Sequence, residues 1–224
     1  MVTKAHLGTG SMAQYVAVPA AAGIAHLPHG VLVRDAGALG PAGTVAFDGL
    51  ALLGPLEGST VLISGATGGV GAIAVQPAAA RGARVIATAK SGSESGFVSA
   101  LTDAEVTVID YTQDVTAQVR TIAPDGVDAV LHLAGDLAEL TTLTRDGGAV
   151  ASALTVPEAS EDRKLQTAMI RSDPTADTLS ALAGQVASDA LKVSVSAEFD
   201  LEHAPEAFAA FGAGTLGKIA VAVA

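Results

Sequence analysis

The chain has 224 residues with a formal net charge of −11, and 50% of its residues are hydrophobic. That hydrophobic content supports a large buried core and excludes global disorder. The acidic balance, with no basic block to offset it, argues against nucleic acid and membranes as partners. Cysteine is absent, which excludes disulfides, thiolate nucleophiles and Cys-based zinc sites. Neither a secretory signal nor an apolar run of membrane-spanning length is visible, so we expect a cytoplasmic protein.

From Gly58 onward, short strand-like runs alternate with helical patterns. The expected strands are apolar with little polar alternation, which is typical of a parallel sheet covered by helices on both faces. We therefore predict an α/β fold with a doubly wound parallel sheet of Rossmann type, and ligands at the carboxyl ends of its strands. Strands are expected at residues 61–64, 83–89, 105–110, 127–134 and 147–154, and helices at about 69–81, 93–101, 114–122, 136–143 and 175–187.

The two ends of the chain differ from this alternating pattern. A strand-like run, Gln14 to Val18, precedes a connector broken by Pro and Gly. The tail predicts a strand, a helix from Glu206 to Phe211 and a terminal strand. We expect small β pieces of a second unit at both ends. The predicted domains are residues 1–32, the dinucleotide-binding residues 33–190, and residues 191–224.

A glycine-rich turn follows the first of the central strands. Residues 66–71, ATGGVG, fit A-x-G-x-x-G, with alanine in the first glycine position. The turn follows an apolar strand and opens a helix, which is the context of a dinucleotide-binding fingerprint. Gly68 would let backbone N–H groups approach a pyrophosphate, and Gly71 would let the helix pack closely on the strand. The alternative is a plain strand–turn–helix connector.

The end of the second strand bears on which dinucleotide binds. Sites that prefer NAD place an acidic residue there for the ribose 2′-hydroxyl. This chain has Ala89, Lys90 and Ser91, and its first acidic residue, Glu94, comes later. A lysine suits a 2′-phosphate, so we predict NADPH as the cofactor. The alternative is that Lys90 is a solvated loop residue.

Residues 56–89, LEGSTVLISGATGGVGAIAVQPAAARGARVIATA, resemble the nucleotide-binding core of the zinc-independent medium-chain dehydrogenase/reductase family, in its quinone oxidoreductase (zeta-crystallin-like) branch. Residues 10–31, 36–58, 105–114 and 215–224 also resemble segments of that family, in the same order. The resemblance implies a pyrophosphate at Gly68 to Val70 and an adenosine phosphate near Lys90 and Tyr111. It also implies that Ala134, Gly135 and Ala153 border the nicotinamide ribose and that Thr44 lies near the ring. The expected cofactor-binding residues are Thr44, Ala66, Thr67, Gly68, Gly69, Val70, Ala89, Lys90, Ser91, Tyr111, Ala134, Gly135 and Ala153.

Some of these residues have a plainer interpretation. Tyr111 would be a half-buried loop aromatic, and Thr44 a helix residue bonded to its own backbone. The chain also departs from the family. The family begins with a GroES-like substrate domain, of which only closing segments are expected here, so one side of the substrate cleft would be absent. Pro77 stands where the family has an ordinary helix former, and a proline inside a helix costs about 3 kcal/mol unless the helix bends.

Other chemistries find little support in the sequence. Neither tyrosine is followed by lysine in a Tyr-x-x-x-Lys pattern, and no His-Glu-x-x-His motif is present. His26 and His29 are interpreted as solvated, and His132 as a core histidine, so we expect no metal site. No residue is assigned a catalytic role.

Two functions remain open at this stage. The first is an NADPH-dependent oxidoreductase that transfers a hydride to a small-molecule substrate, a quinone or an α,β-unsaturated carbonyl, without a metal. The second is a non-catalytic NADPH-binding module that acts as a sensor or partner subunit. The end strands lack their usual neighbours, and unpaired strand edges need cover, so we expect a homodimer.

Overall fold

The computed structural model describes residues 12–18, 23–158 and 161–223. The chain divides into two compact units. The sheet unit is Val45–Arg171, and the end unit combines Met1–Thr44 with Ser172–Ala224. The division falls inside helix α1, Val33–Leu52, so this helix contributes residues to both units. Helix α6, Ala176–Ala187, falls in the end unit by contacts, whereas the sequence boundaries group it with the dinucleotide-binding domain.

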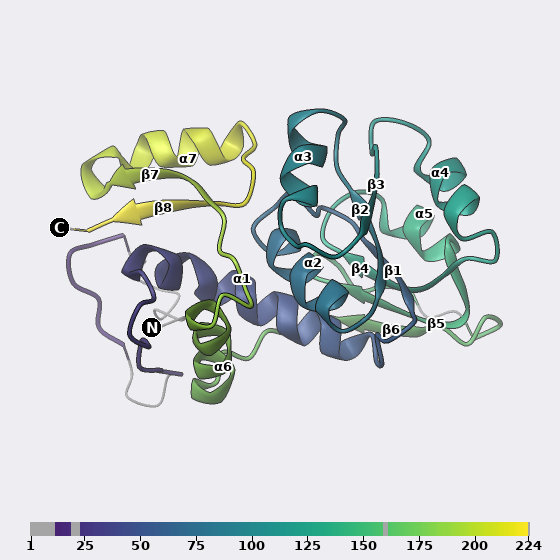
Figure 1. Cartoon of the computed structure of the whole chain (residues 1–224), viewed down its shortest axis with the longest axis horizontal. Helices are drawn as coiled ribbons and strands as arrows, with labels where there is room; N and C mark the ends of the chain where they lie inside the picture. The colour runs from purple at the N-terminus through teal and green to yellow at the C-terminus, as the bar shows by residue number, and fades with distance from the viewer. Residues whose placement is uncertain (1–11, 19–22, 159–160, 224) are drawn as a thin grey trace. The chain divides into compact units, whose positions relative to one another are not determined.

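The sheet unit contains a six-stranded sheet in the order β3-β2-β1-β4-β5-β6, in which all neighbouring strands are parallel (Figure 1). This is the strand order of the doubly wound dinucleotide-binding fold, with its switch point between β1 and β4. The predicted fold class is therefore confirmed. The strands are β1 Thr60–Ile63, β2 Arg84–Thr88, β3 Val106–Ile109, β4 Val127–His132, β5 Thr144–Ser152 and β6 Gln166–Met169. The helices between them are α2 Gly71–Ala80, α3 Ser93–Ser99, α4 Val115–Ile122 and α5 Leu137–Thr142.

Helices cover both faces of this sheet, which explains why its strands are apolar throughout. One row of side chains crosses four neighbouring strands, because Leu62 is in register with Ile86 and Val130, and Val130 with Val150. This row belongs to a buried cluster that includes Val119 of α4 and Leu140 of α5. Side chains alternate along a strand, so the neighbouring residues of each strand face the other side. In Figure 1, α2 and α3 lie on the opposite side of the strands from α4 and α5.

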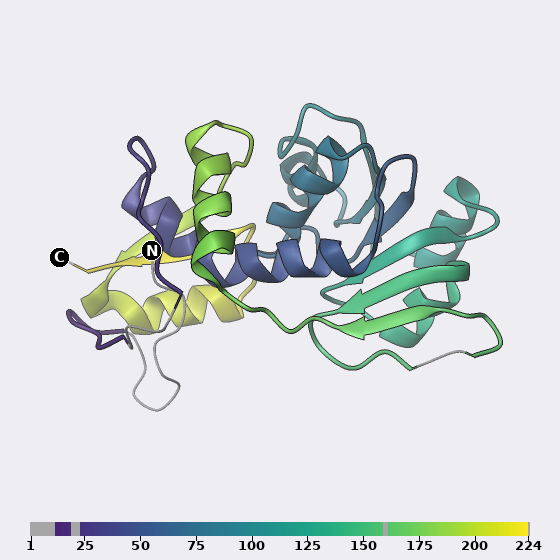
Figure 2. The same ribbon diagram turned by 90° about the horizontal axis from the view of Figure 1, so that it is seen from below.

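The second half of α1 packs on the sheet within the same unit, and Figure 2 shows this helix together with the green strands β4, β5 and β6. A Cβ atom built at Gly49 would lie 2.8 Å from Leu131 Cδ1 and 2.9 Å from Ile170 Cδ1. Glycine thus lets the helix approach the sheet closely without moving the ends of these two side chains. The Arg81 guanidinium also lies 5.7 Å from the centroid of the Phe47 ring, which joins the end of α2 to α1.

Pro77 lies inside α2 without ending it. The helix continues to Ala80, and Arg81 N donates to Pro77 O at 3.1 Å. Residues 71–79 of the helix are all buried. Since burial of apolar surface stabilises the helix in place, it offsets the hydrogen bond that proline cannot donate.

The end unit carries the small β element expected at the tail. Strand β7 Val195–Asp200, helix α7 Ala204–Gly212 and strand β8 Lys218–Ala222 form a β-α-β unit, with β7 and β8 parallel. Helix α6 begins after Thr175, whose hydroxyl accepts from Thr178 N. The strand expected at Gln14 to Val18 is not formed, and Tyr15 is 91% exposed. A strand forms only when its backbone pairs with a neighbouring strand. Among the described residues, the small sheet of the end unit consists of β7 and β8, so residues 14–18 do not pair with it.

Among the helices that the structure describes, none combines the length and the hydropathy that a membrane span requires.

Candidate functional site

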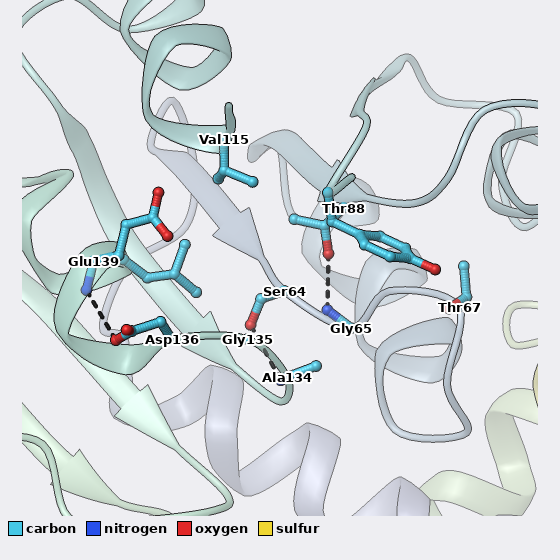
Figure 3. Close-up of a pocket in the computed structure, with 11 residues that line it drawn as sticks. Ser64, Gly65, Thr67, Thr88, Val115, Ala134, Gly135, Asp136 and Glu139 are labelled. Carbon is cyan, nitrogen blue, oxygen red and sulfur yellow. Dashed lines mark hydrogen bonds between the residues drawn. The ribbon is translucent and has the colours of Figure 1, made fainter. Parts of the chain in front are cut away.

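A pocket of about 490 Å³ opens at the carboxyl ends of strands β1 to β4. This edge, at the point where the strand order reverses, is where open α/β sheets bind their ligands. Figure 3 shows Asp136 and Glu139 at one end of the pocket and Thr67 at the other, with Gly65 and Thr88 between them. The pocket is lined by Ser64, Gly65, Thr67, Thr88, Tyr111, Val115, Ala134, Gly135, Asp136, Glu139 and Leu140.

The turn between β1 and α2 is built by its glycines. Gly65 has a φ of +70°, and its amide donates to Thr88 Oγ1 at 2.9 Å, which ties the turn to the end of β2. Gly68 N donates to Gly65 O at 3.1 Å and so closes the turn. A Cβ atom built at Gly71 would lie 2.6 Å from Ala66 Cα and would also meet Gly65 O. No side chain larger than hydrogen fits there, so the last glycine of the motif allows the close approach of α2 to the turn that follows β1.

Gly68 has a different environment. A Cβ atom built there would meet Gly65 O at 3.4 Å, an ordinary contact, and, its chain neighbours aside, no other atom of the described residues lies within 4 Å of it. The fold itself therefore leaves room above the turn. The first amides of an α-helix have no intrahelical acceptor and attract anions. Ala72 N, in the first turn of α2, donates to Gly68 O at 2.9 Å, so a pyrophosphate would meet the open space over Gly68 and the amides that precede Ala72.

Ser64 joins the ends of the two central strands. Its hydroxyl donates to Leu131 O at 3.4 Å and accepts from Leu133 N at 3.1 Å and Ala134 N at 3.4 Å. Ser64 is buried, so these bonds hold the loop after β4 against the glycine turn. Ala134 and Gly135 are thereby placed on the wall of the pocket.

The far wall comes from α4 and α5 and combines apolar with acidic groups. Asp136 caps α5, since its Oδ1 accepts from Ala138 N at 2.8 Å and Glu139 N at 3.3 Å. Glu139 in turn accepts from Thr116 Oγ1 at 2.9 Å. Val115 and Leu140 line the pocket between these polar groups. A wall of this kind suits a flat heterocycle whose edge carries hydrogen-bond donors.

The ends of β2 and β3 are joined by a carboxylate that the sequence did not single out. Glu94, in the first turn of α3, accepts from Lys90 N at 2.8 Å and from the Tyr111 hydroxyl at 3.1 Å. Partial burial, followed by the hydrogen bond to Glu94, raises the pKa of Tyr111 above its ordinary value. Tyr111 is thus both a pocket wall and a polar partner of Glu94.

Asp110 makes a second carboxylate link beside the first. Its carboxylate accepts from Ser91 N at 3.0 Å and Ser91 Oγ at 2.6 Å. It also accepts from Thr112 N at 2.8 Å and Thr112 Oγ1 at 2.6 Å. These bonds, with the Ser91 and Thr112 hydroxyls as the largest causes, hold the pKa of Asp110 well below its usual range. The loops after β2 and β3 are therefore fixed to each other by an ionised aspartate.

His132, at the end of β4, is a satisfied core histidine, as the sequence interpretation has it. It is 2% exposed, with Nδ1 2.8 Å from Ser152 Oγ and Nε2 3.1 Å from Gly135 O. The Ser152 hydroxyl also accepts from two backbone amides, those of Leu154 and Thr155, at 3.2 Å each. The hydroxyl proton of Ser152 is therefore directed to Nδ1 of His132, and Nε2–H of His132 donates to Gly135 O. Ser152 and His132 together hold the turn at Gly135 in place. Gly135 has a φ of +86° and lines the pocket.

The structure brings most of the predicted cofactor residues to this edge of the sheet. Thr67, Tyr111, Ala134 and Gly135 line the pocket. The remaining residues of the sheet unit stand in the adjoining turn or directly after β2 and β5, and Ala153 N donates to His132 O at 3.0 Å. The residues in these adjoining positions are Ala66, Gly68, Gly69, Val70, Ala89, Lys90, Ser91 and Ala153.

Thr44 belongs to the end unit and is fully buried. Its hydroxyl lies 3.1 Å from Gly40 O and 3.0 Å from Pro41 O, and it accepts from Ser172 Oγ at 2.6 Å. These bonds agree with the plainer interpretation of Thr44 as a helix residue bonded to its own backbone. A place beside a nicotinamide ring stays a prediction.

Sequence reasoning missed seven of the eleven residues that line the pocket. Some missed residues had a local signal: Thr88 ends a strand, and Asp136 stands where a helix cap is expected. Others had none, because Val115 and Leu140 look like any apolar helix residue. The missed lining residues are Ser64, Gly65, Thr88, Val115, Asp136, Glu139 and Leu140. Across the described residues, no three His, Asp or Glu side chains come together as a metal site requires.

Comparisons with known proteins point to one family. A protein-family model described as zinc-binding dehydrogenase matches residues 104–221. Alcohol dehydrogenase 1 of Emericella nidulans is 34% identical over 122 residues, covering 54% of this chain and 34% of that protein. Prostaglandin reductase-3 of Bos taurus is 35% identical over 132 residues, covering 58% of this chain and 34% of that protein. The matches thus span about a third of the length of these curated relatives.

Solved structures extend the similarity to most of the chain. An NAD-dependent alcohol dehydrogenase has a TM-score of 0.82 at 28% identity, covering 96% of this chain and 66% of that one. The quinone oxidoreductase from Coxiella burnetii has a TM-score of 0.73 at 26% identity, covering 81% and 58%. A mycobacterial protein complexed with NADPH has a TM-score of 0.71 at 27% identity, covering 87% and 68%.

Proposed function

This chain belongs to the zinc-binding dehydrogenase family of medium-chain dehydrogenases/reductases, and we propose that it is an oxidoreductase that uses NADPH to reduce a quinone or an α,β-unsaturated carbonyl compound. The observation that carries the proposal is the glycine turn between β1 and α2. Gly71 is closed by packing, whereas the space above Gly68 is open beside the pocket. Packing alone requires the last glycine of the motif and leaves the middle one free for a ligand.

The sheet unit supplies a surface for each part of a dinucleotide. The amides at the start of α2 would receive the pyrophosphate, and Val115 and Leu140 would pack against the adenine ring. Ala134 and Gly135 would border the nicotinamide ribose, held in place by Ser64 and His132. The cofactor, when bound, supplies the hydride, so the side chains have the task of binding and orientation.

NADPH is preferred over NADH on the strength of Lys90. It follows β2, in the loop where the adenosine ribose is held in this fold. Among the similar structures, one is named as an NADPH complex and another as an NAD-dependent enzyme, so both cofactors occur among proteins of this fold. The lysine cation is the feature of this chain that favours the 2′-phosphate.

The substrate class is proposed from the named relatives. A prostaglandin reductase and a quinone oxidoreductase both stand among the similar proteins. Reduction of a quinone or an enone places a hydride on an electron-poor carbon, and no metal is needed for that step. The chain has no cysteine, and thiolate ligation of a catalytic zinc is therefore not available to it.

The proposal is tested by the loss of the reduced nicotinamide absorbance in the presence of a panel of quinones and enones. NADPH and NADH are run in parallel, and binding of each is measured separately by calorimetry. Turnover with NADPH supports the oxidoreductase. Binding without turnover across the panel favours the non-catalytic NADPH-binding module, and absence of binding by either dinucleotide contradicts both functions.

A further inference from the structure

We propose that Glu94 is a specificity-determining residue whose carboxylate occupies the place of the 2′-phosphate, so that NADPH binds only by displacing it. The inference rests on the proposed dinucleotide function and concerns the strand ends beside the pocket, which Glu94 reaches through its contact with the lining residue Tyr111. Lys90 would attract the 2′-phosphate, whereas the carboxylate of Glu94 would repel it.

The contacts of Glu94 come from two different strand ends. Its Oε2 accepts from Lys90 N at 2.8 Å, just after β2. Its Oε1 accepts from the Tyr111 hydroxyl at 3.1 Å, just after β3. Both oxygens of the carboxylate are thus engaged by donors at the adenosine side of the pocket, where Tyr111 forms part of the lining.

The neighbouring hydrogen-bond donors also bond to a carboxylate already. Asp110 accepts from both Ser91 N and Ser91 Oγ, at 3.0 and 2.6 Å. With the amide and hydroxyl of Thr112, three amides and three hydroxyls after β2 and β3 therefore already bond to these two carboxylates. These are the donor types that a phosphate ester recruits, since it has strong acceptor oxygens and a charge of about −1.5 to −2 at neutral pH.

Glu94 and Asp110 differ in how readily an incoming phosphate can displace their carboxylates. Asp110 accepts four hydrogen bonds from two residues, and these bonds hold its pKa well below its usual range, so it is fixed in place. Glu94 is held by one amide and one phenol at the end of a longer side chain. Glu94 is thus the group that an incoming phosphate displaces.

The two cofactors meet this carboxylate differently. A ribose 2′-hydroxyl can donate a hydrogen bond to Glu94, as it does to acidic residues in NAD sites. A 2′-phosphate is mostly doubly ionised at neutral pH, and its charge is repelled by the carboxylate of Glu94. Glu94 therefore lowers the affinity for NADPH and favours NADH, while Lys90 acts in the opposite direction.

The test compares Glu94→Gln with a matched control, Glu105→Gln, by titration of NADPH and NADH into the full chain. Glu105 is exposed just before β3, at the amino end of the strand and so on the opposite edge of the sheet. Both variants change the net charge equally, and thermal unfolding checks that each remains folded. Removing a charge beside a phosphate is worth about tenfold in affinity, or about 1.4 kcal/mol.

We expect Glu94→Gln to lower the Kd for NADPH about tenfold and to leave the Kd for NADH equal or higher. Glu105→Gln should change both constants less than about twofold, because screened charges interact weakly across the sheet. Equal effects of the two variants on NADPH, with both dinucleotides still binding, would overturn the role of Glu94 and leave the proposed function intact. Absence of binding by every variant would overturn the dinucleotide site and this inference with it.

The phenol of Tyr111 offers a readout that does not depend on turnover. Its hydrogen bond to Glu94 contributes to the raised pKa of Tyr111. Glu94→Gln should therefore lower that pKa in an ultraviolet titration, and the chain has two tyrosines to follow. An unchanged titration would show that the Glu94–Tyr111 contact is not formed in solution, which would overturn the proposal.

Discussion

The two glycines of the β1–α2 turn should respond in opposite ways to the same added methyl group. Gly71→Ala places a Cβ atom 2.6 Å from Ala66 Cα and 2.8 Å from Gly65 C, both of which are backbone atoms. Gly68→Ala places one 3.4 Å from Gly65 O, which is ordinary contact. The first change should therefore damage the fold, and the second should damage only a site above the turn.

The magnitudes follow from these contacts. Overpacking against atoms that cannot rotate away costs about 3 kcal/mol, and alanine returns about 1 kcal/mol of helix propensity, so Gly71→Ala should lose about 2 kcal/mol of stability. For a chain of this size that lowers Tm by about 4–8 °C. Gly68 has no positive φ, and its alanine variant should change Tm by less than about 3 °C. Its methyl group would occupy the pyrophosphate position and should raise the Kd for NADPH at least about tenfold.

The assay is thermal unfolding of both variants, followed by NADPH titration into Gly68→Ala and the unchanged chain. A stable Gly68→Ala variant with unimpaired NADPH binding would refute the placement of the pyrophosphate above this turn. A Gly71→Ala variant as stable as the unchanged chain would refute the packing argument for the last glycine of the motif.

Three further predictions concern the cofactor, the aspartate link and assembly. Lys90→Asp should weaken NADPH binding and raise the relative affinity for NADH, and an unchanged ratio of the two Kd values would mean that Lys90 does not contact the phosphate. Ser91→Ala should raise the pKa of Asp110 toward its ordinary value, as measured by NMR titration, because the Ser91 hydroxyl is the largest cause of the depression. Folding depresses the pKa of Asp110, so its stabilisation is present above the pKa of the unfolded state and is lost as the pH falls through the pKa of the folded state. The Ser91→Ala variant should therefore lose less stability in acid than the unchanged chain. The chain should sediment as a homodimer at micromolar concentration, and a monomer throughout would contradict this. Among the described residues, β7 and β8 each have one edge without a neighbouring strand. Phe208 and Phe211 are also exposed on α7.

Local pattern was sufficient for strands β1 to β5 and for the glycine turn, whereas β6, Gln166–Met169, was not among the expected strands. Strands such as β1 and β2 are short apolar runs between turn residues, and each sits within one or two residues of its expected bounds. The packing role of Gly71 also follows from its place in the motif. These features depend on residues close together in sequence, which is why periodicity and spacing are enough to find them.

Long-range contacts were beyond the reach of the same reasoning. Glu94 and Tyr111 are 17 residues apart, and their contact depends on the first turn of α3 meeting the loop after β3. The run from Gln14 to Val18 has the composition of a strand, yet it forms none because a strand also needs a bonding partner. Thr44 sits in a helix in either interpretation, and its bonds to Gly40, Pro41 and Ser172 emerge only from the packed structure.

The measurement that most directly tests the central claim is calorimetric titration of NADPH into the unchanged chain. Saturable binding of one NADPH per chain is predicted, and a subsequent crystal structure should place the cofactor over Gly68 and in the pocket lined by Tyr111 and Gly135. Absence of heat at millimolar NADPH, from a chain shown to be folded by its thermal transition, would contradict the dinucleotide site and the function proposed from it.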